Sequence, residues 1–395
     1  MVKLNGWPNT FDERAKALDA SVDDLVVVRP KPIGDKNKHE SIESVTTYNL
    51  YPQRGAFVKP SWVKPFVFSI HVLQAVLLLI YLQFKQERPS VIHAFDYALG
   101  GFAGAVVSQL FSVPLIVSVR GLKEPIYNEM IEEEGTYRAR IKYQILTTMT
   151  RFVLVRANHI VTKSPYQVKF VRERFGIDPG FTTLPTGVDF DTFDPEAVTK
   201  ENALRDLLSS EGHDIESNDR IILFLGKLVQ EKGPDTVLEL LDQSSSEVSE
   251  DIVFVFIGEF RSESFERQFR ELQKEVPHKT ILYPNRVPFE DVPDILFDAD
   301  GVILLSKSGT EGAPRVLQEA CAMETSIIAS EVDGIKGAFA GLPGCHLIGR
   351  TDHIAFANAV NNAVEESVSR ARFAEQFDMY ENYSQYADIY RQLSD

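Results

Sequence analysis

Short apolar runs alternate with longer helical stretches along almost the whole chain, and this alternation constrains the fold more than any other feature. Runs of this length separated by helices are typical of strands in a parallel α/β sheet. We therefore predict an α/β protein with two doubly wound domains. The predicted strands lie at 23–30, 90–95, 114–121 and 159–164 in the first half, and at 220–228, 251–259, 280–285, 300–306 and 325–330 in the second.

A polar, acidic segment between the two halves marks a domain boundary. Residues 189–220 contain no apolar run suited to a strand, so we read them as a connection with one short helix. We place the boundary near residue 200, with an N-terminal domain at 1–200 and a C-terminal domain at 201–375. Two such domains facing each other would form a cleft at the carboxyl ends of their strands, where ligands of doubly wound sheets bind.

Composition and charge exclude several classes of protein. The 395 residues carry a net charge of −16, from 57 acidic and 41 basic residues. This argues against a general nucleic-acid binder, which needs a basic surface. Cys321 and Cys345 are the only cysteines in the sequence, which predicts neither a disulfide framework nor a cysteine metal site. The first residues lack the apolar core of a signal peptide, so we expect a cytoplasmic protein.

One apolar segment, residues 66–84, raises the question of membrane contact. It is nearly long enough to span a bilayer. Ser69, His71, Gln74 and Gln83 interrupt it, which favours a buried or partly membrane-facing helix over a spanning one. A helix lying in the membrane interface would carry a similar pattern, so peripheral contact with the inner face of a membrane is a further expectation.

The segment "FLGKLVQEKG" (224–233) places two lysines around a turn at the end of a predicted strand. Gly226 ends the strand and lets the backbone approach a ligand closely. Lys227 and Lys232 would form a cation cluster the size of a phosphate group. The alternative is two solvated surface lysines.

The segment "SGTEGAPRVLQEACA" (308–322) places Glu311 and Glu319 around the start of a predicted helix. The backbone of Gly312, Ala313 and Pro314 leads into that helix, and the N–H groups of residues 313, 315 and 316 would form a phosphate cradle. Alternatively, Glu311 is a favourable charge near a helix N-terminus and Glu319 pairs with an arginine four residues earlier. Carboxylates accept strong hydrogen bonds from hydroxyl groups, so two acids beside cations also suit a nucleotide-sugar, which has a diphosphate between two sugars.

Four motifs in order resemble the retaining glycosyltransferases of family 4, which have the GT-B fold. "ILFLGKLVQEKGPDTVLELL" is similar to the family's Gly-Arg-Leu…Glu-Lys-Gly segment, and "DADGVILLSKSGTEGAPRVLQEACA" to its Glu-x7-Glu block. "ANHIVTKSPYQVKFVRERFGI" with "LPTGVDFDTFDP" resembles the run that closes the first domain. "PSVIHAFDYALGGFAGAVVSQLFSVPLIVSVRGLKE" resembles the segment that usually carries His-Ala-His-Asp. The resemblance covers roughly residues 85–390.

The resemblance implies roles by position. Lys227 and Lys232 would contact the donor diphosphate, and Glu311 the donor sugar; these three are our predicted catalytic residues. Glu319 would bind the ribose hydroxyls. The remaining predicted donor-binding residues are Gly226, Arg286, Val287, Gly312, Ala313, Pro314 and Val316.

The resemblance implies that Arg120 lies in the acceptor side of the cleft. His93 is a second candidate there, because its position at a strand end favours a side chain that faces the cleft. The resemblance also implies that a terminal helix at 376–395 packs back on the N-terminal domain. Lys227 stands where the family usually has arginine, which removes a planar fork for phosphate. The first strand and its glycine-rich loop are reduced to "MVKLNGWPN", which leaves the N-terminal loop's part in the site open.

We therefore predict a retaining hexosyltransferase with a nucleotide-diphosphate-sugar donor and a glycan, lipid-linked or small-molecule acceptor. We expect no cofactor and no metal, and we read the Asp-x-Asp sequences at 189–191 and 298–300 as structural. The alternative is a non-catalytic nucleotide-sugar-binding scaffold, and a glycosidase acid pair is a weaker reading, because a hydrolase would not need the lysine cluster.

Overall fold

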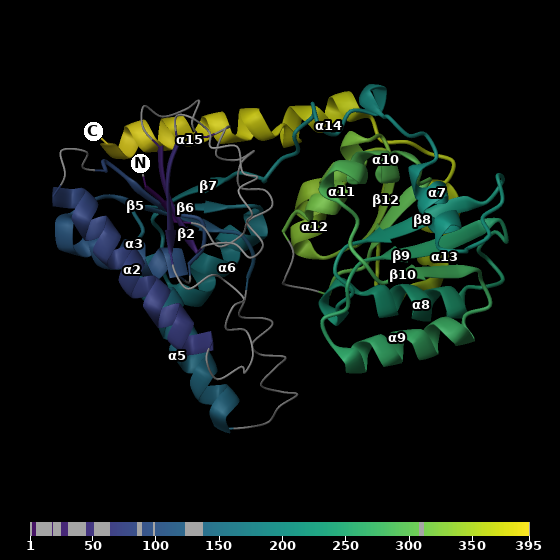
Figure 1. Cartoon of the computed structure of the whole chain (residues 1–395), viewed down its shortest axis with the longest axis horizontal. Coiled ribbons are helices and arrows are strands. Elements are labelled where there is room, and N and C mark those ends of the chain that lie inside the picture. The colour runs from purple at the N-terminus through teal and green to yellow at the C-terminus, as the bar shows by residue number, and fades with distance from the viewer. Residues whose placement is uncertain are drawn as a thin grey trace. The chain divides into compact units, whose positions relative to one another are not determined.

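The computed structural model describes residues 2–4, 18, 25–30, 45–50, 64–84, 89–97, 99–122, 137–307 and 312–394. Its contacts divide the chain into unit 1, Met1–Pro185 with Tyr380–Asp395, and unit 2, Thr186–Met379 (Figure 1). The division precedes the predicted boundary near residue 200. The reason is that Val188 pairs with the segment before the last helix: its N–H donates to the carbonyl of Phe377, and its carbonyl accepts from Met379.

Unit 1 contains a seven-stranded parallel sheet in the order β3-β2-β1-β4-β5-β6-β7. Its amino-terminal strand β1 lies in the interior of the sheet, because Val2 is in register with Val26 on one side and Ile92 on the other. Strands β3 and β7 were not predicted, since Thr, Tyr and Asn interrupt their apolar pattern. The strands are β1 (Val2–Leu4), β2 (Leu25–Pro30), β3 (Val45–Leu50), β4 (Ile92–Ala94), β5 (Leu115–Val119), β6 (His159–Thr162) and β7 (Gly180–Thr183).

Helices α2 (Lys64–Phe84), α3 (Leu99–Phe111) and α5 (Tyr137–Arg156) pack side by side in unit 1, with α3 in the middle (Figure 1). Helix α6 (Pro165–Phe175) packs against β6 and β7, and α15 (Met379–Ser394) ends the chain. The apolar segment 66–84 is thus part of a helix that packs against α3. Among the described helices, none is both long and apolar enough to cross a bilayer.

Unit 2 contains a six-stranded parallel sheet in the order β10-β9-β8-β11-β12-β13. Every side chain of β9 is buried, as expected for a strand covered by helices on both faces. The five strands predicted in this half are present, and β13 is additional. The strands are β8 (Arg220–Leu225), β9 (Ile252–Ile257), β10 (Thr280–Tyr283), β11 (Gly301–Leu304), β12 (Ser326–Ser330) and β13 (Cys345–Ile348).

The helices of unit 2 connect these strands and complete its core. Short 3₁₀ turns at Pro195–Ala197, Gln230–Lys232 and Phe289–Asp291 precede three of them. The helices are α7 (Ala203–Ser210), α8 (Pro234–Gln243), α9 (Glu263–Glu275), α10 (Val292–Phe297), α11 (Arg315–Ala322), α12 (Asp333–Phe339), α13 (His353–Ala363) and α14 (Arg370–Phe377). Each unit is therefore a parallel α/β domain, as predicted.

Candidate functional site: the strand ends of unit 2

The strand order of unit 2 reverses direction between β8 and β11, which lie side by side. Such a reversal is the place where an open α/β sheet binds its ligand, beyond the carboxyl ends of the strands. Most of the predicted donor-binding residues lie just after these ends. Gly226 and Lys227 follow β8, Arg286 and Val287 follow β10, and Gly312, Ala313, Pro314, Val316 and Glu319 follow β11.

Two glycines bring the backbones after β8 and β9 into close contact. Gly226 has φ +151° and Gly258 has φ +150°. The N–H of Gly226 donates to the carbonyl of Ile257 at 2.9 Å, and a Cβ added to Gly258 would lie 1.6 Å from the carbonyl oxygen of Gly226. A side chain at Gly258 would therefore push away the start of the loop between β8 and α8, which carries Lys227 and Lys232 and is called the lysine loop below.

The lysine loop packs closely against the end of β11. Gly233 has φ +69°, and a Cβ there would lie 2.0 Å from the carbonyl oxygen of Leu305. The N–H of Lys307 donates to the carbonyl of Glu231 at 3.0 Å. These contacts hold Lys232, the residue between Glu231 and Gly233, beside the residues that lead from β11 towards α11.

Three half-buried lysines consequently lie on the loops at the carboxyl ends of these strands: Lys227, Lys232 and Lys307. Lys307 was missed by the sequence reasoning. A signal was present, because Lys307 follows the apolar run 300–306 in the same way that Lys227 follows its strand. Without the pairing of β8 with β11, nothing joined Lys307 to the other two.

The start of α11 is anchored by a buried glutamine. Gln318 is fully buried; its Nε2 donates to the carbonyl of Ala313 at 2.7 Å, and its Oε1 accepts from the N–H of Gly187 at 3.1 Å. Helix α11 begins at Arg315, directly after Pro314. The first N–H groups of a helix have no partner within the helix, so the anchored segment presents donors at a fixed position. Glu311 lies outside the described residues.

Glu319 is 8% exposed and pairs with Arg315, with 2.7 Å between its Oε1 and the guanidinium. The pairing that we considered as an alternative therefore exists, but on a largely buried carboxylate. An ion pair through one oxygen leaves the second oxygen able to accept hydrogen bonds. The role of Glu319 at a ribose stays a prediction.

A second acid, Asp235, is buried behind the lysine loop in the first turn of α8 and was not singled out from the sequence. Burial raises the pKa of Asp235, although the positive charges of Lys307 and Arg350 oppose this. Its Oδ1 has no hydrogen-bond partner within the described part of the chain. When the Asp235 carboxyl is ionised, its charge and that of Lys307 attract each other.

Arg286 lies at the end of β10 and forms an ion pair of 2.6 Å with Glu259, the residue after Gly258. Both side chains are well exposed, so this pair adds little stability. Val287 is half-buried against the core of unit 2. Their predicted part in donor binding stays a prediction.

In unit 1, His93 is fully buried in an aromatic cluster. Its Nδ1 lies 2.7 Å from the hydroxyl of Tyr390 on α15, its Nε2 lies 2.8 Å from the hydroxyl of Ser118, and its ring stacks on Phe95. These contacts tie α15 to the sheet of unit 1. Arg120 is half-buried and directly follows β5. The acceptor roles predicted for His93 and Arg120 stay predictions.

The two Asp-x-Asp sequences have structural contacts. Asp300 accepts from the N–H of Ile221 at 2.7 Å, at the amino end of β8, opposite the lysine loop. Asp298 binds Arg205, and Asp189 accepts hydrogen bonds from the following residues of its own loop.

Two parallel α/β domains, one of them with candidate ligand loops at a strand reversal, are the architecture of the GT-B class of glycosyltransferases. Family comparison agrees: the glycosyl transferases group 1 model matches residues 208–378, and the glycosyl transferase 4-like domain matches residues 6–187. The chain belongs to this family and is a glycosyltransferase, which confirms the predicted family, fold class and enzyme class.

Two curated relatives are themselves described as glycosyltransferases. One, described as a teichuronic acid biosynthesis glycosyltransferase of Bacillus subtilis, is 25% identical over 81% of this chain and 71% of the relative. A D-inositol 3-phosphate glycosyltransferase of Xylanimonas cellulosilytica is 24% identical over 72% of this chain and 66% of the relative.

Solved structures share the fold. Sucrose-phosphate synthase from Thermosynechococcus elongatus aligns with a TM-score of 0.75 at 15% identity, covering 99% of this chain and 98% of that chain. HepE from Anabaena, solved in complex with UDP-glucose, aligns with a TM-score of 0.68 at 14% identity, covering 99% of both chains. WaaG, a glycosyltransferase involved in lipopolysaccharide biosynthesis, aligns with a TM-score of 0.62 at 15% identity, covering 100% of this chain and 99% of that chain.

Proposed function

We propose that this glycosyltransferase moves a hexose-type sugar from a nucleotide-diphosphate-sugar to a glycan, lipid-linked or small-molecule acceptor, with retention of anomeric configuration. The proposal rests on the packing of the lysine loop against the end of β11, at Gly233 and through the hydrogen bond of the Lys307 N–H. This packing brings lysine side chains close to the point where the strand order reverses, which is where a diphosphate would bind.

The donor class is supported by the chemistry of this edge and by relatives of the same fold. Ammonium groups neutralise a diphosphate, while Glu319 can accept a hydrogen bond from a hydroxyl group of the nucleoside. HepE was solved with UDP-glucose. The base and the sugar of this chain's donor are what the first experiment determines.

The chemical step needs stabilisation of the leaving diphosphate. Negative charge grows on its oxygen as the glycosidic bond breaks, and preorganised cations at Lys227 and Lys232 would stabilise that charge most in the transition state. The N–H groups at the start of α11 add to this field. In this scheme the lysines take the place of a divalent metal, Glu311 contacts the transferred sugar, and the acceptor attacks from the face that the nucleotide leaves.

The acceptor would bind to unit 1, and Arg120, which follows β5, would contribute to its site. A relative described by teichuronic acid biosynthesis supports an acceptor of the polysaccharide type. A reaction at the cytoplasmic face of a membrane would suit a lipid-linked or growing polysaccharide acceptor.

A thermal-shift panel of UDP-, GDP- and ADP-sugars tests the donor class, because a ligand that binds only the folded state raises the melting temperature by mass action. We expect one nucleotide series to raise it. The donor that binds is then incubated with candidate acceptors, and the anomeric configuration of the product is read by NMR. An inverted product refutes retention, and donor binding without turnover on any acceptor favours the scaffold alternative.

A further inference from the structure

Three neighbouring helices of unit 1 contain no acidic residue, although the chain as a whole is strongly acidic. The sequences of α2, α3 and α5 contain no Asp or Glu, while the whole chain has 57 acidic and 41 basic residues. Helix α3 lies between the other two, so the helices form one continuous layer that carries only positive charge. The basic side chains that the structure describes in this layer are Arg140, Arg151 and Arg156.

Helix α2 is apolar on its outer face as well as on its buried face. His71, Ala75 and Leu79, each four residues apart, are buried towards the core. A second stripe at the same spacing is exposed: Leu73 is 59%, Leu77 56% and Tyr81 52% exposed, and Phe84 at the end of the helix is 77% exposed. A helix that faces water on one side normally carries polar residues there.

The exposed apolar surface continues onto α3 and α5. The ring of Phe84 meets that of Phe111 edge to face, with 6.1 Å between centroids, where α2 and α3 end together. Leu110 on α3 is 63% exposed. On α5, Tyr137, Ile141 and Ile145 repeat the four-residue spacing and are all exposed. Large exposed apolar patches mark interaction surfaces rather than ordinary solvent-facing helices.

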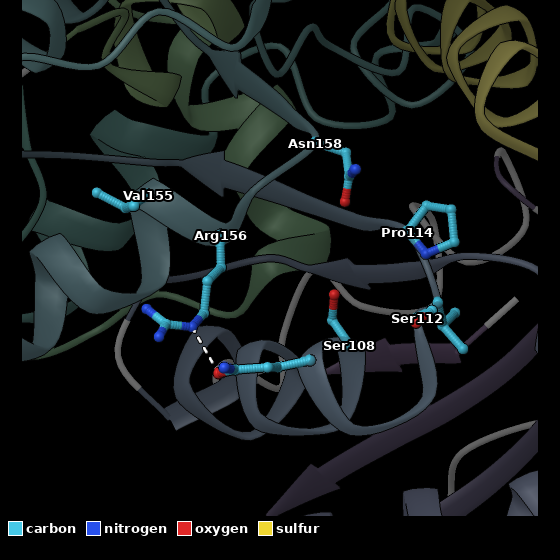
Figure 2. Close-up of a pocket in the computed structure, with 8 residues that line it drawn as sticks. Ser108, Ser112, Pro114, Val155, Arg156 and Asn158 are labelled. Atoms are coloured by element: carbon cyan, nitrogen blue, oxygen red, sulfur yellow. Dashed lines mark hydrogen bonds between the residues drawn. The ribbon is translucent and has the colours of Figure 1, made fainter.

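A pocket of about 540 Å³ opens between the carboxyl ends of α3 and α5. Figure 2 shows Arg156 among the lining residues of this pocket. The Nε of Arg156, on α5, donates a hydrogen bond of 2.8 Å to Oε1 of Gln109, on α3. The guanidinium also lies over the ring of Phe152, 3.7 Å from its centroid. Ser108 and Ser112 bring hydroxyl groups to the same pocket. The pocket therefore offers a held cation and hydroxyl groups to an anionic ligand.

This pocket is separate from the predicted acceptor site. Its lining residues Pro114 and Asn158 directly precede β5 and β6, whereas Arg120 follows β5. Since the strands are parallel, the pocket lies at their amino ends and Arg120 at their carboxyl ends. The pocket adjoins the exposed apolar layer instead, through Val155, which lines it and is itself 51% exposed.

We propose that the layer formed by α2, α3 and α5, the basic apolar face, docks onto an anionic phospholipid bilayer, and that the pocket at Arg156 receives a lipid phosphate. Exposed apolar side chains would insert at the headgroup boundary, and the cations would bind the negative lipid surface. A second copy of this chain is a poor occupant, because two such faces would bring only positive charges together. The helices lie on the bilayer rather than cross it.

Docking is independent of the proposed function, because it requires neither donor nor acceptor. The test is co-sedimentation of the full chain with vesicles of phosphatidylcholine alone or mixed with phosphatidylglycerol, with no nucleotide-sugar present. We expect binding to the anionic vesicles, weakened by added salt, and little binding to the neutral vesicles. Equal binding to both, or binding to neither, overturns the proposal without affecting the donor chemistry.

Substitutions locate the surface. We expect Leu77→Glu to weaken vesicle binding by about tenfold or more, because it removes an exposed apolar side chain that would insert into the bilayer. We expect Arg151→Gln to weaken it by about fivefold, from the loss of one cation near the lipid surface. The matched controls lie on unit 2: Ile354→Glu replaces an equally exposed apolar residue, and Arg267→Gln an exposed arginine. The controls should bind as the unchanged chain does.

The pocket has its own test. Arg156→Gln should weaken binding to anionic vesicles by about fivefold, while Arg156→Lys retains most of it; equal binding by both variants removes the pocket from the proposal. Circular dichroism melting confirms that each variant is folded. If Leu77→Glu abolishes a concentration-dependent dimer seen by light scattering and leaves vesicle binding unchanged, the face is a self-association surface and the membrane proposal is wrong.

Discussion

The tight contact of Gly233 with Leu305 allows a quantitative prediction about the lysine loop. In Gly233→Ala, the new methyl group would lie 2.0 Å from the carbonyl oxygen of Leu305, at a φ of +69°. The left-handed conformation costs about 1–2 kcal/mol for alanine, and the lower entropy of the unfolded chain offsets about 0.4–1 kcal/mol of that. Relief of the overlap by backbone movement adds about 1–3 kcal/mol. We therefore expect a loss of about 1–5 kcal/mol in the free energy of unfolding of unit 2.

A matched glycine in the same unit separates the two contributions. Gly212 has φ +85°, and a Cβ there would meet nothing within 4 Å. Gly212→Ala should therefore lose only the conformational part, about 1 kcal/mol. Urea unfolding followed by circular dichroism measures both variants. The movement should also carry Lys232 away from the end of β11, so turnover should fall in Gly233→Ala and stay normal in Gly212→Ala under conditions where both are folded.

The comparison can fail in two ways. Equal losses of stability in the two variants would show that the Leu305 contact relaxes without cost. Unchanged turnover in a destabilised Gly233→Ala would show that the position of the lysine loop does not matter for the reaction.

Three further predictions concern neighbouring side chains. Lys232→Ala should lower turnover by about 10²–10³, as the loss of a transition-state donor does; near-normal nucleotide release, with exposed Lys274→Ala as the control, would exclude a phosphate role. Glu319→Ala should weaken donor binding by about tenfold or more, because it removes a charged hydrogen bond; an unchanged dissociation constant by calorimetry would remove Glu319 from the ribose. Burial raises the pKa of Asp235, so its contribution to stability is largest below its unfolded pKa and is lost as pH rises through the folded pKa. Asp235→Asn should therefore melt higher than the unchanged chain at pH 7, and this advantage should shrink towards about pH 4; a pH-independent difference would contradict it.

Much of the fold was predictable because parallel strands buried on both faces are continuous apolar runs. The runs at 220–228 and 251–259 became β8 and β9 for this reason. Strands β3 and β7 were missed because their threonines and other polar residues hide the pattern. Strand β1 was not predicted because three residues are too few to show an apolar pattern, although its pairing with β2 and β4 places it in the interior of the sheet.

The candidate site was predictable only segment by segment. Each of the stretches 224–233 and 308–322 announces a turn or a helix start at a strand end, through its glycines and Pro314. The participation of Lys307, the anchoring of α11 by Gln318 and the burial of Asp235 depend on which strands are neighbours, and local pattern does not encode this. His93 shows the same limit, since its partner Tyr390 lies at the far end of the chain.

The sequence by itself determined the fold class, the apolar strands and the residue types available for binding a diphosphate, because these follow from local pattern and composition. It also determined that α2, α3 and α5 carry no acid. Only the tertiary structure decided that β8 lies beside β11, so that Lys227, Lys232 and Lys307 follow adjacent strand ends. It likewise placed the acid-free helices in one layer. Contacts between residues distant in the chain arise from the order of strands, and that order is set by the packing of the whole domain.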